Sequence, residues 1–167
     1  LCTELATFKN GRAKAFTIKD KYGNDTGAQG VKTHFTLKND IFWGDGIPVT
    51  SKDILFTWQV GKHRETGVAN YQSFKDILDI QIHNDKSFTV TNKKLDYQYH
   101  TLSGFNVLPA HLEKEAFIKP RNYRNKTLYQ TNPTHPGLYN GPYRITKIVP
   151  GSYIVLEKNK YWMGKPP

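Results

Sequence analysis

The sequence predicts an α+β fold with a mostly antiparallel mixed sheet and a few short helices. Three observations lead to this prediction. Runs of alternating apolar residues come in pairs separated by turn residues, which is typical of β-hairpins. One segment, residues 49–61, has the start signal, the apolar face and the stop signal of an amphipathic helix. Too few helical segments lie between the strands for a doubly wound parallel sheet.

The first predicted hairpin lies near the start of the chain. Residues 16–18 and 31–37 alternate apolar and polar side chains, and residues 21–27 (KYGNDTG) supply Gly and Asn for a turn with positive φ. Further along, Gly44-Asp45-Gly46 is interpreted as a tight turn. It lacks the Gly-Lys-Ser/Thr ending of a phosphate-binding loop, and the Asp45 carboxylate would repel phosphate.

The helix at residues 49–61 is the clearest local signal in the chain. Thr50 or Ser51 can cap its N-terminus, and Asp53, three residues after Thr50, approximates a capping box. Gly61 is a suitable stop. Three apolar side chains share one face of this helix: Ile54, Leu55 and Trp58. We expect Trp58, like Trp43 before the helix, to belong to the core.

The remaining elements are predicted from the same kinds of signal. Apolar spacing predicts a second helix over residues 71–78, and alternation on both sides of a polar turn predicts a hairpin over residues 80–90. Pro109 can occupy the first turn of a short helix that runs through residue 117. Residues 119–137 are rich in Asn, Pro, Lys and Thr and predict a long surface excursion. A last hairpin is expected over residues 143–157, across Pro150-Gly151.

Length and composition limit the possible classes. The chain has 167 residues, enough for one compact domain or for a large and a small lobe. No apolar stretch approaches the ~20 residues of a membrane-spanning helix. Cys2 is the only cysteine, which excludes an intrachain disulfide and a zinc site built from several thiolates. The chain opens on LCTE without an initiator Met and stops at GKPP after a strand-like run, so we interpret it as a piece of something longer.

The charge balance permits a polyanionic partner without requiring one. The sequence has 24 Lys and Arg against 14 Asp and Glu, a formal net charge of +10. The basic residues are spread along the chain, and the densest runs, at residues 92–94 and 119–126, lie in segments expected to be loops. This distribution favours a solvated basic surface, and a basic nucleic-acid-binding module remains the alternative hypothesis.

The usual catalytic and metal-binding patterns are missing. None of the serines lies in a Gly-x-Ser-x-Gly elbow, and Cys2 is expected at a frayed end, where a reactive thiol is unfavourable. The six histidines lack metal-binding spacing, and His111 and Glu113 should point in different directions. Asp76 and Asp79 are expected on a solvated helix face. We therefore expect no catalytic residue, no metal and no cofactor, and the abundance of Tyr, Phe and Trp favours binding over catalysis.

Three segments in order along the chain carry a resemblance to a known family. Residues 35–58 (FTLKNDIFWGDGIPVTSKDILFTW) resemble the signature stretch of extracytoplasmic solute-binding proteins of family 5, the oligopeptide, dipeptide and nickel receptors of ABC importers. Residues 140–145 (NGPYRI) resemble the Gly-Pro-Tyr strand of the family, and residues 155–166 (VLEKNKYWMGKP) resemble the strand that follows it.

The resemblance implies where this chain belongs in such a receptor. It implies part of a lobe of the type II periplasmic-binding-protein kind, with residues 1–167 as a fragment of the first lobe. A small subdomain would cover about residues 31–137, and strands returning to the large lobe would cover about residues 138–160. The second lobe, which closes over ligand in the family, would lie outside this chain.

The resemblance also implies a function, namely binding of peptides or a similar small solute for import, without catalysis. The partners would be the solute and the membrane permease of an ABC importer, with no nucleic acid, and the protein would be a monomer. Its location would be periplasmic or extracytoplasmic, with a lipid anchor on a preceding segment as one form. Residues 68–71 and 103–106 resemble segments that approach the ligand cleft, so Tyr71, Phe105 and Asn106 are the ligand-binding residues we expect.

Overall fold

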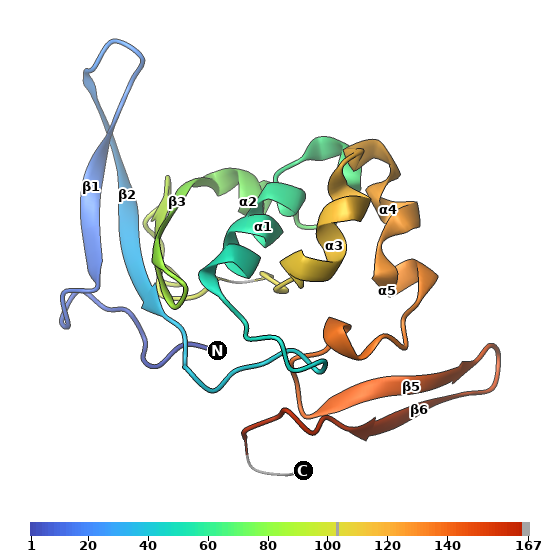
Figure 1. Ribbon diagram of the computed structural model, residues 1–167. Helices are drawn as coiled ribbons and strands as arrows, with labels where there is room; N and C mark the ends of the chain where they lie inside the picture. Colours follow the sequence, from blue (N-terminus) through green and yellow to red (C-terminus); the bar gives the residue numbers. More distant parts are fainter. Residues whose placement is uncertain (103, 165–167) are drawn as a thin grey trace.

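The computed structural model of the protein describes residues 1–102 and 104–164. Ser103, which opens one of the segments expected near the cleft, and residues 165–166, which end the third matching segment, lie outside the described residues. The predicted α+β class is confirmed, because a four-stranded antiparallel sheet, a two-stranded sheet and short helices make up the fold. The helices lie beside the larger sheet, and the two-stranded sheet lies apart near the C-terminus (Figure 1). None of the described helices is long and apolar enough to cross a membrane.

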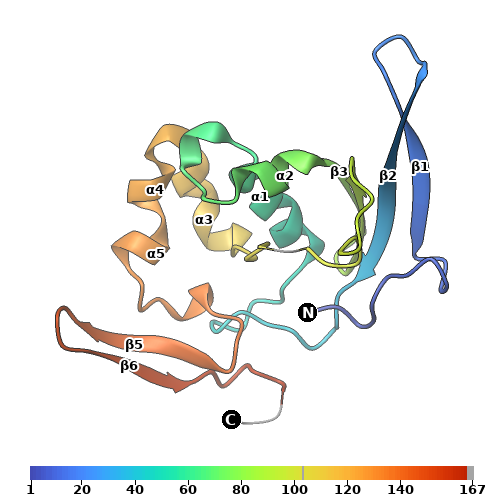
Figure 2. The same ribbon diagram turned by 180° about the vertical axis from the view of Figure 1, so that it is seen from behind.

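The larger sheet is made of two hairpins in the strand order β1-β2-β4-β3. Its strands are β1 (Ala13–Lys19), β2 (Asp25–Thr36), β3 (Ile77–Asn84) and β4 (Ser87–Asn92). Both predicted hairpins are therefore confirmed. In the central pair, Phe35 lies opposite Phe88 and Thr33 opposite Val90, and these four side chains are buried. The tip of the β1–β2 hairpin projects beyond the rest of the sheet (Figures 1 and 2).

The central element is α1, which begins where the sequence predicts. The helices are α1 (Ser51–Gly61), α2 (Tyr71–Asp76), α3 (Ala110–Phe117), α4 (Tyr123–Lys126) and α5 (Leu128–Thr131). Thr50 is the N-cap of α1, and Asp53 Oδ2 accepts the Thr50 backbone N–H at 2.8 Å. One side of α1 places Ile54 and Trp58 in the core cluster against the sheet. Another side places Phe56 in a second cluster with residues of α3 and α4.

The predicted core positions of the two tryptophans are confirmed, since Trp43 is 1% and Trp58 7% exposed. Trp58 Nε1 also donates to the Phe74 carbonyl oxygen at 3.1 Å, which ties α1 to α2. The expectation that Cys2 lies at a frayed end is wrong, because Cys2 pairs with Leu37 in an isolated β-bridge. Burial raises the pKa of its thiol, so the thiolate is disfavoured.

The helix expected over residues 71–78 is shorter in the structure. It ends at Asp76, and Ile77 is already the first residue of β3, where it pairs with Asn92 of β4. The expectation that Asp76 and Asp79 share a solvated helix face is therefore wrong. Asp76 is buried and Asp79 lies on β3, because pairing with β4 takes the chain into the sheet before the helical pattern ends.

Residues 119–137, expected to be a long surface excursion, do lie mostly at the surface, but they are not an irregular loop. This stretch folds into α4, α5 and 3-10 turns at Pro120–Asn122 and Pro136–Leu138, and Tyr123 within it is 6% exposed. The sequence signal fails here because the ordering group, the carboxylate of Glu113, lies on another helix.

Glu113 on α3 is fully buried and organises α4 and α5. Its carboxylate accepts hydrogen bonds from the Tyr123 hydroxyl at 2.7 Å, the Thr127 hydroxyl at 2.6 Å and the Leu128 N–H at 2.8 Å. Leu128 is the first residue of α5, so the carboxylate satisfies one of the free N–H groups at a helix start. Burial and the Glu113 carboxylate raise the pKa of Tyr123. His111, two residues earlier, instead contacts Asp45, which confirms the predicted divergence of the two side chains.

The two-stranded sheet consists of β5 (Tyr143–Val149) and β6 (Tyr153–Lys158), which confirms the last predicted hairpin. Apolar side chains remain exposed on it, among them Tyr153 at 50%, Ile154 at 58% and Leu156 at 56%. Two strands alone bury little apolar surface. Among the described residues no further strand pairs with this hairpin, so these apolar side chains stay uncovered.

We predict that Glu113→Gln destabilises the protein by about 1–3 kcal/mol, because the amide replaces an acceptor oxygen with a donor that faces other donors. Urea unfolding of the two forms measures the difference. Glu115→Gln, on the exposed side of the same helix, is the matched control and should change stability by less than about 0.5 kcal/mol. Equal effects of the two substitutions would contradict the role given to the Glu113 carboxylate.

Candidate functional site

The segment between Leu102 and α3 carries two of the three predicted ligand-binding residues. From residue 104 to residue 108 its side chains alternate between two sides. Phe105 and Val107 face hollows next to the sheet, whereas Gly104, Asn106 and Leu108 face a hollow above α1. This alternation is typical of an extended chain. The structure therefore places Phe105 and Asn106 on opposite sides of one segment.

The hollow that Asn106 faces has a volume of about 240 Å³, and we call it the asparagine hollow. Its described lining residues are Thr57, Val60, Gly61, Val68, Ala69, Asn70, Phe74, Gly104, Asn106 and Leu108. None of these described residues is charged. The polar groups that line the hollow are the two asparagine amides, the Thr57 hydroxyl and backbone groups, which both donate and accept hydrogen bonds.

Glycine is required at position 104, where the segment that carries Asn106 comes close to Asn70. Gly104 has a φ of +73°, and a Cβ at this position would lie 2.8 Å from Asn70 Nδ2. A larger residue would therefore be strained and would push Asn70 away. At the floor, a Cβ on Gly61 would lie 2.4 Å from the Phe74 ring, so the end of α1 and α2 pack in direct contact.

Hydrogen bonds from α1 fix the segment that carries Asn106. Thr57 Oγ1 donates to the Asp53 carbonyl at 2.7 Å and accepts the Leu108 N–H at 2.8 Å. Asp53 Oδ1 accepts the Ala110 N–H at 2.8 Å, which also satisfies the first N–H of α3. Two side chains of one helix thus hold the backbone on the C-terminal side of Asn106.

The other predicted residues lie around this hollow without lining it. Tyr71 is half-buried at the first position of α2, directly after Asn70. The Phe105 ring packs on Phe74 with 5.3 Å between ring centroids. Sequence reasoning includes Asn70 in the segment 68–71 without singling it out, and it misses Thr57. An Asn directly before a predicted helix and a Thr one turn after the helix-capping Asp were the available signals.

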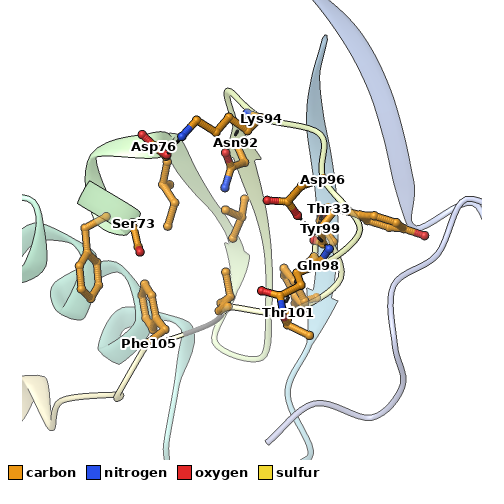
Figure 3. A pocket seen from close by; sticks show the side chains of 15 residues that line it. Thr33, Ser73, Asp76, Asn92, Lys94, Asp96, Gln98, Tyr99, Thr101 and Phe105 are labelled. Carbon is orange, nitrogen blue, oxygen red and sulfur yellow. Dashed lines mark hydrogen bonds and ion pairs between the residues drawn. The ribbon is translucent and has the colours of Figure 1, made fainter. Parts of the chain in front are cut away.

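Phe105 faces a second hollow of about 220 Å³ between the sheet and α2, which we call the sheet hollow. Its described lining residues are Thr33, Phe35, Ser73, Phe74, Asp76, Ile77, Val90, Asn92, Lys94, Asp96, Gln98, Tyr99, Thr101, Leu102 and Phe105 (Figure 3). Unlike the asparagine hollow, it has charged residues in its wall.

Asp76 forms one side of the sheet hollow together with two lysines. Lys93 Nζ lies 2.8 Å and Lys94 Nζ 2.6 Å from its carboxylate oxygens, and Gln72 Nε2 donates to it at 2.8 Å. Burial opposes ionisation of Asp76, but the hydrogen bonds from these three side chains outweigh burial and lower its pKa to about 2. Asp76 therefore holds the end of α2 against the end of β4.

The candidate site, the asparagine hollow, carries hydrogen-bonding groups of the kind that a binding surface uses. Within the described ranges 1–102 and 104–164, no three His, Cys, Asp or Glu side chains are placed to share a metal ion. His111 Nε2 lies 2.8 Å from Asp45 Oδ2, and this pair links α3 to the Gly44–Gly46 turn. What the asparagine hollow offers a ligand is hydrogen bonding from the two asparagine amides and backbone groups, since the Thr57 hydroxyl already donates to Asp53 and accepts from Leu108.

The three segments that match the solute-binding family meet at one corner of the fold. The Gly44 N–H donates to the carbonyl of Tyr139, the residue directly before the second segment, at 2.7 Å, and Asn159 Nδ2 donates to the Gly141 carbonyl at 3.0 Å. A Cβ on Gly46 would lie 2.8 Å from the Tyr161 ring. The segments are thus constrained by contact with one another.

Comparison with known proteins places this chain among solute-binding proteins. A family model described as bacterial extracellular solute-binding proteins, family 5 Middle, matches residues 25–167. A protein from Agrobacterium fabrum named probable peptide-binding protein YejA is 27% identical over 136 residues, which cover 80% of this chain and 21% of the relative. A Brucella melitensis protein, whose name describes it as a binding protein, is 32% identical over 135 residues, which cover 78% of this chain and 20% of the relative.

Solved structures show the same fold. The oligopeptide-binding protein from Thermus thermophilus, complexed with a pentapeptide, matches 99% of this chain with a TM-score of 0.80 and 25% identity. NikZ from Campylobacter jejuni, in complex with Ni(L-His), matches 89% of the chain with a TM-score of 0.66 and 22% identity. The chain covers 30% and 27% of these two structures, and about a fifth of the curated relatives.

We predict that Thr57→Val loosens the segment around Asn106. Valine keeps the shape of the side chain but leaves the Leu108 N–H without its acceptor, so stability should fall by about 1–2 kcal/mol. Amide hydrogen exchange at Leu108 should accelerate by more than the global loss of stability explains. Thr131→Val is the matched control, because the Thr131 hydroxyl also donates to the carbonyl four residues earlier, at 3.2 Å, and lies on the surface. Unchanged exchange at Leu108 in Thr57→Val would contradict the role given to Thr57.

We predict that the Asp76 ion pairs stabilise the protein in neutral solution and are lost in acid. The pKa of Asp76 is about 2 in the fold, below the ordinary value of about 3.9, so the unfolded chain binds the proton more tightly. This contribution is fully present above about pH 4.5 and disappears as the pH falls towards 2. Unfolding free energies between pH 2 and 6 should therefore fall less steeply for Asp76→Asn than for the wild type. Asp79→Asn, exposed on β3, should keep the wild-type slope.

Proposed function

The chain belongs to the bacterial extracellular solute-binding proteins of family 5, and from this membership we propose that it is part of the substrate-binding component of an ABC importer. Its ligand is a short peptide or a similar small solute, which it binds without making or breaking a bond. The observation that carries this proposal is the match of nearly the whole chain to the Thermus thermophilus oligopeptide-binding protein, with a TM-score of 0.80.

The asparagine hollow suits a peptide. A peptide backbone has neutral N–H and C=O groups, and the described lining of the hollow offers two neutral asparagine amides that pair with such groups. A lining without charge does not select for or against charged side chains, so peptides of many sequences can bind. We propose that Asn106 hydrogen-bonds the ligand backbone, and that Tyr71 and Phe105 contact the ligand from the neighbouring surface.

The division of the chain follows the same proposal. Residues 31–137 would form the small subdomain of the first lobe, and residues 138–160 would return to the large part of that lobe. The exposed apolar side chains of β5 and β6, such as Ile154 and Leu156, support this assignment. In the intact polypeptide, strands from outside residues 1–167 would complete this sheet and cover them.

The proposed partners are the solute and the membrane permease of the importer, with the protein acting as an extracytoplasmic monomer. Attachment to the membrane would come from a lipid on a preceding segment. The comparisons give no support to the alternative of a basic nucleic-acid-binding module, since the relatives are named for binding peptides or other solutes. Some of the basic residues also have acidic partners, as Lys93 and Lys94 have in Asp76.

The proposal predicts that short peptides stabilise the intact polypeptide that contains residues 1–167. A ligand at about 100 times its dissociation constant adds about 2.7 kcal/mol, which a thermal melt detects as a raised Tm. Asn106→Ala should weaken peptide binding about tenfold, because one hydrogen-bonding amide is lost.

Asn125→Ala, at an exposed position of α4, and Tyr97→Ala, with a Tyr97 side chain that is 82% exposed, are the controls and should bind peptides like the wild type. A flat melting response to a broad mixture of peptides would argue against the function. Peptide binding that is unchanged in both Asn106→Ala and Tyr71→Ala would leave the function in place and overturn the assignment of the residues.

A further inference from the structure

The sheet hollow is separate from the asparagine hollow, and its wall is anchored at several points. The Lys93 N–H donates to the Asp76 carbonyl at 3.0 Å, and the Leu95 N–H donates to the Gln29 carbonyl at 3.0 Å. Further along, the Thr33 hydroxyl donates to the Tyr99 carbonyl at 3.4 Å. The segment that closes the hollow is therefore tied to α2 and to β2, which makes the hollow a defined part of the fold.

Two carboxylates line the sheet hollow, and they differ in their contacts with cations. Asp76 is held by Lys93 and Lys94. In the part of the chain that the structure describes, no Lys, Arg or His nitrogen lies within the 4 Å of an ion pair from the Asp96 carboxylate. Asp96 Oδ1 accepts the Gln98 N–H at 2.8 Å, which leaves Oδ2 as a free acceptor. The Asp96 carboxylate is turned toward the hollow (Figure 3).

Apolar side chains, which we call the phenylalanine floor, also line the hollow. Phe35, Phe74 and Phe105 contribute aromatic rings to it, and Ile77 and Val90 contribute branched aliphatic side chains. A free carboxylate together with aromatic and aliphatic side chains matches a ligand with a cationic head and a hydrocarbon body. The volume of about 220 Å³ limits that ligand to roughly the size of an amino acid.

We propose that the sheet hollow binds a small primary amine with an apolar body, with its ammonium group at Asp96 and its hydrocarbon part on the phenylalanine floor. Ser73 and Asn92 supply further polar contacts at the rim. The ammonium donates to the free Asp96 oxygen, and this charge-assisted hydrogen bond is the contact that selects an amine. Asp96 and Ser73 are not among the described residues that line the asparagine hollow, whereas Phe74 lines both hollows and Phe105, assigned above to the peptide, lines this one.

The experiment compares three probes of similar shape on the intact polypeptide, namely 3-methylbutylamine, the neutral 3-methylbutan-1-ol and the anionic 4-methylpentanoate. Binding is followed by NMR chemical-shift changes at the amides of the hollow. The amine should bind with a dissociation constant on the order of 1 mM, as expected for a few well-placed heavy atoms. The alcohol should bind at least about tenfold more weakly, and the carboxylate should not bind at this site.

Asp96→Asn is the test variant, because its amide oxygen can still accept the Gln98 N–H and so keep the turn. It should weaken amine binding at least about tenfold. Asp79→Asn, exposed on β3 and outside the described lining of the hollow, should bind the amine like the wild type. Equal affinity for amine and carboxylate, shift changes mapping elsewhere, or wild-type amine binding in a folded Asp96→Asn would each overturn the proposal. Retention of wild-type shifts outside residues 94–101 in Asp96→Asn confirms that the variant is folded.

Discussion

The carboxylate of Asp53 is the contact on which the rest of this fold depends. One oxygen accepts the Thr50 N–H at the start of α1, and the other accepts the Ala110 N–H at the start of α3. A single buried side chain therefore satisfies both helix starts, although 57 residues separate Asp53 from Ala110. Because Asp53 is 4% exposed, these N–H groups have little access to water as a substitute partner. The position of α3, and with it the segment carrying Asn106, follows from this contact.

The matching segments of the family owe their residue types to contacts with one another. Gly44 and Gly46 are glycines because a carbonyl and the Tyr161 ring occupy the space where a side chain would be. Asn159 is 5% exposed and uses its amide to join Gly141 and Tyr161. Contacts of this kind tolerate few substitutions, so the packing of the fold constrains these positions of the three segments.

Local sequence signals were sufficient to predict those helices and strands whose formation depends on interactions between residues close together in the chain. The hairpins and the Thr50 start of α1 could be predicted because alternation, turn residues and a capping Asp act within a few residues. The burial of Asp76 and the short helices after residue 119 could not be predicted, because the side chains that hold them, Lys93 and Glu113, come from other elements. At the candidate site, the resemblance pointed to the segment of Phe105 and Asn106. Their separation into two hollows follows only from the extended path that Thr57 and Asp53 impose.

Phe74 is the wall between the two hollows, and its fixed position keeps their chemistries apart. Its ring lines both of them and packs on Phe105 with 5.3 Å between ring centroids. Gly61 lets α1 come into direct contact with the ring, and Asp76, two residues further on, is clamped by Lys93 and Lys94. A wall held from both sides cannot turn to merge the two spaces without breaking these contacts. The uncharged hollow above α1 thus stays separate from the hollow that Asp76, Lys94 and Asp96 line, so one stretch of chain faces a neutral space on one side and a charged one on the other.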